Sequence, residues 1–119
     1  MYKVLLDENL PIKIKYRLKD VCEIYTVRDR NWNSLENGHL IAAMEKDNFD
    51  FLITSDKNLQ YQQNLSKYSI GFIVLNVPDN NYETIFSLME KIKKALQNKD
   101  KHKLITNSER GLVFYSCPE

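Results

Sequence analysis

Residues 3–11 read KVLLDENLP, an apolar run that ends in two acidic residues and leads to a proline. The aliphatic part, residues 3–6, is typical of a short buried β-strand. Asn9, Leu10 and Pro11 then predict the start of a helix, because Asn can cap a helix and Pro is tolerated in its first turn. The apolar positions of this helix recur at helical spacing and share one face: Leu10, Ile14, Leu18 and Val21.

The same alternation of apolar run and helical segment continues along the chain. Apolar runs at residues 23–27, 49–55 and 70–77 predict three more strands. Helical spacing predicts one helix from an N-cap at Asn37 to about residue 47 and another over residues 82–98. Other segments are shorter: a polar loop over 28–35, a turn of helix over 56–64, and two edge strands in a hairpin over 103–107 and 112–115. This order is typical of an α/β domain with a mostly parallel central sheet, helices on both faces and a C-terminal edge hairpin.

The composition fits a single globular domain over residues 1–119. Hydrophobic residues make up 43% of the chain and charged residues 28%, far from a disordered or fibrous composition. The formal net charge of +1 indicates neither a strongly basic nucleic-acid-binding protein nor a strongly acidic one. A nucleic-acid partner would therefore have to bind a local basic patch. Cys22 and Cys117 lack zinc-site spacing and are too few for a disulfide scaffold. No apolar run approaches the roughly 18 residues of a membrane span, so we expect a cytoplasmic protein without a membrane partner.

Acidic and amide residues follow two of the predicted strands directly. Asp7-Glu8-Asn9 comes after the first strand and Asp56-Lys57-Asn58 after the third. In an open α/β sheet, ligands bind beyond the carboxyl ends of the strands, near the point where the strand order reverses. If the two strands are neighbours, Asp7 and Asp56 converge, and their oxygen ligands suit Mg²⁺ or Mn²⁺. Asp and Asn also cap helices and start turns at such positions, so a purely local function stays open.

Several motifs together resemble the PIN-like domains of uncharacterised bacterial proteins. They are VLLDENLP at residues 4–11, NGHLI at 37–41, FLITSDKNL at 51–59 and YQQN at 61–64. The resemblance runs from the first strand to about residue 77. PIN domains, which include the VapC-type toxins of toxin–antitoxin pairs, are divalent-metal-dependent ribonucleases with a three-layer α/β fold. The resemblance therefore implies a metal-dependent ribonuclease whose partners are RNA and a small antitoxin protein.

By this resemblance, Asp7 and Asp56 are both the catalytic carboxylates and the ligands of Mg²⁺ or Mn²⁺. Many relatives carry an acidic residue at the start of the second helix, where this chain has Asn37. A third carboxylate then has to come from Glu8 or Glu36. We expect Glu8 to be a catalytic residue and Glu36 to be a metal ligand. The polar residues around these acids are expected to contact the substrate: Asn9, Asn37, Lys57, Asn58, Gln62, Gln63 and Asn64. The amides among them are equally typical of a solvated loop.

Two other functions stay open. The first is a catalytically silent PIN-like module whose last helix or edge hairpin docks a small antitoxin; a homodimer is open as well. The second is a receiver-like phosphoacceptor domain in which Asp56 takes the phosphoryl group. Receivers need Ser or Thr at the end of the fourth strand and Lys before Pro after the fifth, whereas this chain has Asn76-Val77-Pro78 and no Lys-Pro pair.

A tryptophan and two basic runs are further candidates for RNA contact. Trp32, with Arg28 and Arg30 nearby, is able to stack on an unpaired base or to anchor its own loop. The basic residues gather on the first helix and late in the chain: Lys13, Lys15, Arg17, Lys19, Lys91, Lys93, Lys94, Lys99, Lys101 and Lys103. Runs of this kind are also typical of solvated helix faces.

Overall fold

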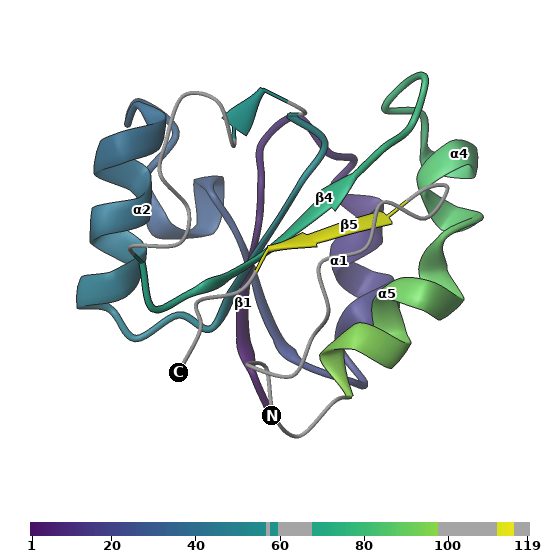
Figure 1. Ribbon diagram of the computed structural model, residues 1–119, viewed down its shortest axis with the longest axis horizontal. Helices are drawn as coiled ribbons and strands as arrows, with labels where there is room; N and C mark the ends of the chain where they lie inside the picture. The colour runs from purple at the N-terminus through teal and green to yellow at the C-terminus, as the bar shows by residue number, and fades with distance from the viewer. Residues whose placement is uncertain (57, 60–67, 98–111, 116–119) are drawn as a thin grey trace.

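A mostly parallel sheet forms the centre of the molecule (Figure 1). The computed structural model describes residues 1–56, 58–59, 68–97 and 112–115, the last four by their backbone alone. Within these residues the sheet has the order β2-β1-β3-β4-β5, with β1 (Lys3–Leu6), β2 (Glu23–Thr26), β3 (Phe51–Thr54), β4 (Gly71–Leu75) and β5 (Leu112–Tyr115). Neighbours among β1 to β4 pair in parallel, whereas β5 pairs antiparallel with β4. The predicted α/β class and mostly parallel sheet are confirmed.

Helices cover both faces of the sheet (Figure 1). On one face, α2 (Asn37–Lys46) packs its buried side chains against alternate strand residues, namely Leu5, Leu52 and Phe72. On the other face, α1 (Lys13–Leu18), α4 (Tyr82–Phe86) and α5 (Met89–Leu96) cover the strand residues of opposite parity: Val4, Leu6, Phe51, Ile53, Ile73 and Leu75. A short 3₁₀ helix, η1 (Arg28–Arg30), follows β2 directly. Because successive strand side chains point to opposite faces, each strand contributes to two apolar cores.

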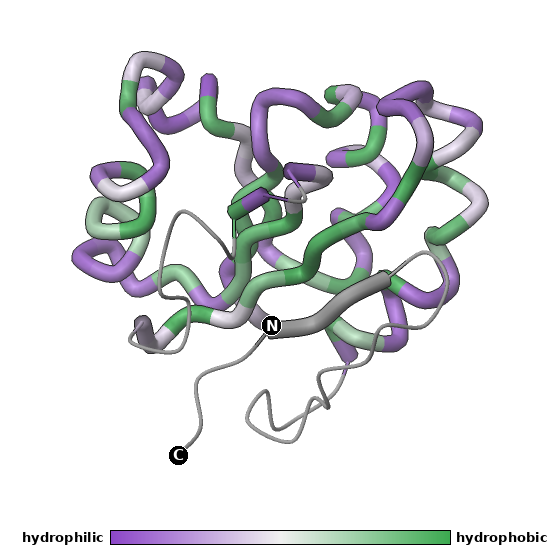
Figure 2. The backbone as a smooth tube through the Cα atoms, turned by 45° about the horizontal axis from the view of Figure 1, so that its top comes forward, coloured by the Kyte–Doolittle hydropathy of each residue, from purple (hydrophilic) through white to green (hydrophobic). Residues whose placement is uncertain are grey.

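Strand β4 is buried along its whole length, as its continuous apolar run predicts. In Figure 2 the apolar colour follows the strands through the middle of the molecule. Gly71 begins β4 opposite Phe51 of β3. A Cβ atom at Gly71 would lie 2.6 Å from Cε1 of the Phe51 ring, so the lack of a side chain allows the two strands to pair here.

The first helix begins later than predicted. Asn9 does not cap it but lies exposed in a turn, which is closed by a hydrogen bond from the Leu10 N–H to the Asp7 carbonyl oxygen (3.1 Å). Ile12 occupies the N-cap position of α1. The predicted apolar face is nevertheless confirmed, because all four positions are buried or half-buried: Leu10, Ile14, Leu18 and Val21.

Two later helices also differ from the prediction. Asn37 is the first residue of α2 rather than its N-cap, because the helical hydrogen bonds already begin at the carbonyl oxygen of Glu36. The single helix predicted over residues 82–98 is divided into α4 and α5. The Ser87 hydroxyl donates to the carbonyl oxygen of Thr84 at 2.6 Å. Such a bond from side chain to backbone competes with helical hydrogen bonds and ends α4 at this point.

Parts of the prediction lie outside the described residues. They include the first strand of the C-terminal hairpin, residues 103–107, and most of the helical turn over residues 56–64. The second hairpin strand is β5, which lies at the edge of the sheet beside β4. Among the helices of the described residues, none has the length and apolar character needed to cross a membrane.

Candidate functional site

The carboxyl ends of β1 and β3 lie side by side. The register pairs Leu6 with Ile53, and the Asp7 N–H extends this ladder by donating to the Ile53 carbonyl oxygen at 2.9 Å. In the order β2-β1-β3-β4, the direction in which strands are added reverses between β1 and β3. Open α/β sheets bind ligands at such a switch point, just beyond the carboxyl ends of the strands. The two strand exits that carry acidic residues are therefore neighbours at the position where a ligand is expected.

The Asp7 carboxylate is held by one hydrogen bond on each oxygen. Its Oδ2 accepts from the Thr54 hydroxyl at 2.6 Å, and its Oδ1 accepts from the Glu8 N–H at 2.9 Å. Burial raises the pKa of Asp7 above its ordinary value, the two hydrogen bonds partly oppose this, and the charges of Glu8 and Asp56 raise the pKa further. A cation beside Asp7 would favour its ionised form, because an opposite charge offsets both the burial and the repulsion.

Thr54 connects Asp7 to Asp56. The Thr54 side chain is buried, and its hydroxyl donates to Asp7 while it accepts from the Asp56 N–H at 3.1 Å. The Oδ1 atom of Asp56 accepts in turn from the N–H of Asn58 at 3.0 Å, which forms a local turn. Asp56 thus has the turn-forming function that the sequence left open. A ligand-binding function is compatible with it, because a carboxylate has two oxygens and several lone pairs.

The third carboxylate expected from the sequence does not join these two. Glu8 is exposed in the turn after β1, and Glu36 is exposed before the first residue of α2. In the described part of the chain, no three His, Cys, Asp or Glu side chains gather closely enough to hold a metal ion. Mg²⁺ usually keeps several waters and binds through one or two carboxylates together with substrate phosphates. Asp7 and Asp56 could hold an ion in that way, with water completing its coordination.

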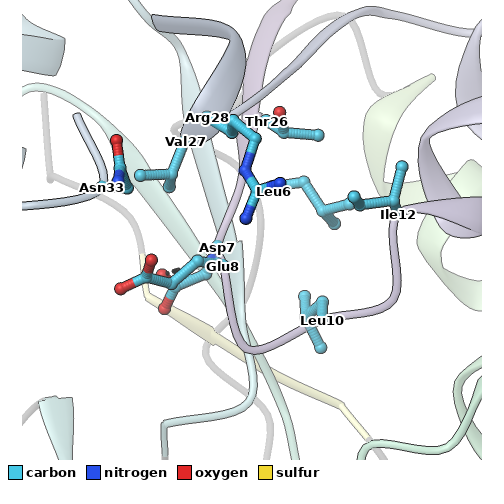
Figure 3. A pocket seen from close by; sticks show the side chains of 9 residues that line it. All are labelled: Leu6, Asp7, Glu8, Leu10, Ile12, Thr26, Val27, Arg28 and Asn33. Carbon is cyan, nitrogen blue, oxygen red and sulfur yellow. Dashed lines mark hydrogen bonds between the residues drawn. The ribbon is translucent and has the colours of Figure 1, made fainter. Parts of the chain in front are cut away.

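A small pocket opens beside Asp7, between the ends of β1 and β2 (Figure 3). Its volume is about 110 Å³, and nine residues line it: Leu6, Asp7, Glu8, Leu10, Ile12, Thr26, Val27, Arg28 and Asn33. Figure 3 shows the Arg28 guanidinium pointing into the pocket from the side opposite the carboxylates of Asp7 and Glu8. In the sequence, Arg28 stands out only as a neighbour of Trp32. The pocket is not visible there, because the sequence does not reveal that β2 lies next to β1.

The turn that carries Arg28 is fixed by reciprocal hydrogen bonds. The Thr26 N–H donates to Asp29 Oδ2 at 2.9 Å, and the Asp29 N–H donates to Thr26 Oγ1 at 3.0 Å. Lys15 of α1 also donates to Asp29 Oδ2 at 2.7 Å. This bond and the one from the Thr26 N–H lower the pKa of Asp29. The spacing Thr-x-x-Asp resembles a capping box, and it is the sequence signal that could have revealed this ordered turn.

The remaining candidates divide into three groups. Asn9 is exposed two positions after Asp7, and Asn58 is exposed where it contacts Asp56, so both lie at the same edge of the sheet. Asn37 is half-buried at the start of α2. The others lie outside the described residues: Lys57, Gln62, Gln63 and Asn64.

Trp32 anchors its own loop. Its ring packs on Phe49, with the ring centroids 5.5 Å apart, and the Arg30 guanidinium lies 5.2 Å from the Trp32 centroid. Trp32 is half-buried against the core on the α2 side of the sheet. Of the two interpretations from the sequence, these contacts favour the anchor over a platform for an RNA base.

Comparison of the chain with protein-family models, with curated proteins and with solved structures gives no match. A fold alone does not determine a function, so the geometry of the site and the sequence motifs are the grounds on which a function can be proposed.

Proposed function

We propose that the chain is a PIN-like, Mg²⁺- or Mn²⁺-dependent ribonuclease, acting in the cytoplasm as the toxin of a toxin–antitoxin pair. The observation that carries the proposal is the link from Asp7 through the Thr54 hydroxyl to Asp56 at the β1–β3 switch point. The link ends at the Asp56 backbone N–H, and the charge of the Asp56 carboxylate raises the pKa of Asp7. Together these observations support a shared ligand for the two carboxylates at the edge of the sheet where such folds bind ligands. The toxin assignment and the RNA substrate rest on the motif resemblance alone.

The roles of the residues follow from their surroundings. Asp7 supplies a partly buried carboxylate oriented by Thr54 and by the Glu8 N–H, and Asp56 supplies a second one fixed by its turn. When bound, the divalent ion lowers the pKa of a water and neutralises charge on a phosphate. Glu8, exposed beside Asp7, is suited to accept a proton from that water rather than to bind the ion directly.

The test combines ion binding with RNA cleavage. Mn²⁺ is titrated calorimetrically into the wild type, Asp7→Asn and Asp56→Asn, and the same samples are incubated with single-stranded RNA. We expect ion binding and cleavage to be lost in both variants. The matched control is Glu90→Gln, which removes an exposed carboxylate from α5 and should retain both activities. Separate Glu8→Gln and Glu36→Gln variants should retain Mn²⁺ binding to within about threefold if neither is a direct ligand.

A folded wild type that binds no Mn²⁺ and cleaves no RNA would overturn this proposal. That result would instead favour the catalytically silent module with an antitoxin partner. Cleavage that persists unchanged in EDTA would also contradict it, because the carboxylates would then act without a metal.

A further inference from the structure

Arg28 differs from the other described arginines in lacking a partner within the described residues. Arg30 forms an ion pair with Asp47 and lies over the Trp32 ring, and Arg17 donates to the Tyr82 hydroxyl at 2.8 Å. Arg28 makes no ion pair and no side-chain hydrogen bond with any described residue, although its turn is held firmly by Thr26 and Asp29. A guanidinium presented on a fixed turn, into a pocket, is available for an external anion.

The size of the pocket limits what can enter it. Its volume of about 110 Å³ is smaller than a cavity of roughly 150 Å³ that accommodates one benzene ring. A nucleobase with its ribose is therefore too large to be enclosed, whereas a phosphate group with a bridging water fits. Apolar side chains, Leu6, Leu10 and Ile12, line the wall next to Arg28 and reduce competition from water for its hydrogen bonds.

The charges around the pocket determine when a phosphate can bind there. Two carboxylates, Asp7 and Glu8, face one guanidinium, so the lining has a net charge of −1 when all three are ionised. An isolated phosphate is repelled by that balance. Asp56 adds one more negative charge, and a divalent ion on Asp7 and Asp56 would bring the total to zero, which removes the net repulsion. The pocket thus suits a phosphate that lies between the guanidinium and a metal-occupied acidic site.

We propose that this pocket binds a phosphate of the RNA backbone and that Arg28 is its ligand. The inference rests on the proposed nuclease function and adds to it a binding residue that the sequence motifs do not identify. Its position, on the β2 side of Asp7 and away from β3, puts the bound strand across the ends of β2, β1 and β3.

The experiment measures RNA affinity separately from metal affinity. A fluorescein-labelled single-stranded RNA of twelve nucleotides is titrated with protein in Ca²⁺, its anisotropy is followed at several salt concentrations, and its integrity is checked on a gel. For Arg28→Gln we expect about tenfold weaker RNA binding, and a slope of log K against log[salt] reduced by about 0.7, the loss of one phosphate contact. Arg28→Lys should keep the wild-type slope, because it keeps the charge. Mn²⁺ affinity, measured calorimetrically, should stay within about twofold in both variants.

The control and the outcomes separate the two proposals. Lys46→Gln removes an exposed positive charge at the far end of α2, near the start of β1, and should change neither affinity nor slope. If Arg28→Gln binds RNA with the wild-type affinity and slope while the wild type binds Mn²⁺ and cleaves RNA, Arg28 is not a phosphate ligand and the nuclease proposal stands. If the wild type binds no Mn²⁺, the nuclease proposal fails and this inference fails with it.

Discussion

The hydroxyl of Thr54 donates a 2.6 Å hydrogen bond to the Asp7 carboxylate, from the end of β3 to the end of β1. The same hydroxyl oxygen accepts from the Asp56 N–H, so one buried side chain satisfies groups at both strand exits. A buried threonine at this position is therefore part of the candidate site as well as part of the sheet.

Replacing Thr54 by valine tests this connection. Thr54→Val preserves the shape of the side chain but leaves a carboxylate oxygen and a backbone N–H without their partner. We expect a loss of about 1–3 kcal/mol in the free energy of unfolding, measured by urea denaturation. Thr54→Ser keeps the hydroxyl and should lie closer to the wild type. Equal stability of the valine variant and the wild type would show that water replaces the hydroxyl without cost.

The raised pKa of Asp7 makes the stability of the protein depend on pH. A carboxyl group whose pKa is higher in the folded state binds its proton more tightly there, so stability falls as pH rises from the ordinary pKa through the raised one. At neutral pH in EDTA we therefore expect Asp7→Asn to be more stable than the wild type. The difference should shrink as the pH is lowered to about 4.

This comparison is made by urea denaturation at several pH values. The control is Asp56→Asn, in which Asp7 loses one source of repulsion but stays partly buried. A wild type that is more stable than Asp7→Asn at neutral pH without metal would contradict the explanation by burial. It would mean that the hydrogen bonds from Thr54 and Glu8 outweigh the loss of hydration.

Gly71→Ala should destabilise the core between β3 and β4. The new methyl group would lie 2.6 Å from the ring of Phe51, which is itself buried and packed edge-on against Tyr2. We expect a cost of about 1–3 kcal/mol, measured by thermal or urea denaturation. In the double variant with Phe51→Leu, the effect of the alanine should be smaller than in the wild-type background. Two strictly additive substitutions would show that the ring is not the obstacle.

Cys22 should be inert to thiol reagents in the folded protein. Burial raises its pKa to about 12, and its Sγ–H donates to the Leu18 carbonyl oxygen at 3.4 Å. Because the thiolate is the reactive form, modification at pH 8 should wait for unfolding. The measurement uses Cys117→Ser, so that a single thiol is counted, with and without denaturant. Rapid modification of the folded variant would show that the α1–β2 turn opens frequently.

The sequence predicts much of this fold because its apolar runs are short and clearly separated. Residues 70–77 are apolar almost throughout, and the strand found within them, β4, is buried on both faces. The division of the last helix is not visible in the apolar spacing, because that spacing continues past Ser87 and the break depends on where one hydroxyl bonds. Local side-chain hydrogen bonds of this kind are decided by geometry that a pattern of residue types does not contain.

The candidate site also has residues that the sequence predicts and residues that it does not. Asp7 and Asp56 can be recognised as candidate site residues in the sequence because each follows an apolar run. Their proximity depends on β1 lying beside β3, which the structure shows and the sequence does not. In the sequence, Thr54 is simply a residue of the third predicted strand, and Arg28 is a loop residue near Trp32. They can be recognised as site residues only from the structure, in which Thr54 bonds Asp7 and Arg28 lines the same pocket as Asp7.

Strand β1 lies between β2 and β3, and these two neighbours differ in how far along the chain they lie from it. Lys3 pairs with Glu23 within one β-α-β unit, whereas Thr54 reaches Asp7 from 47 positions away and has to close a longer loop. In a chain in which only β1, α1 and β2 have docked, Asp7 lacks its hydrogen bond from the Thr54 hydroxyl. The arrangement of Asp7, Thr54 and Asp56 therefore exists only once β3 has docked beside β1, and a growing chain gains it only after residue 56 has been synthesised.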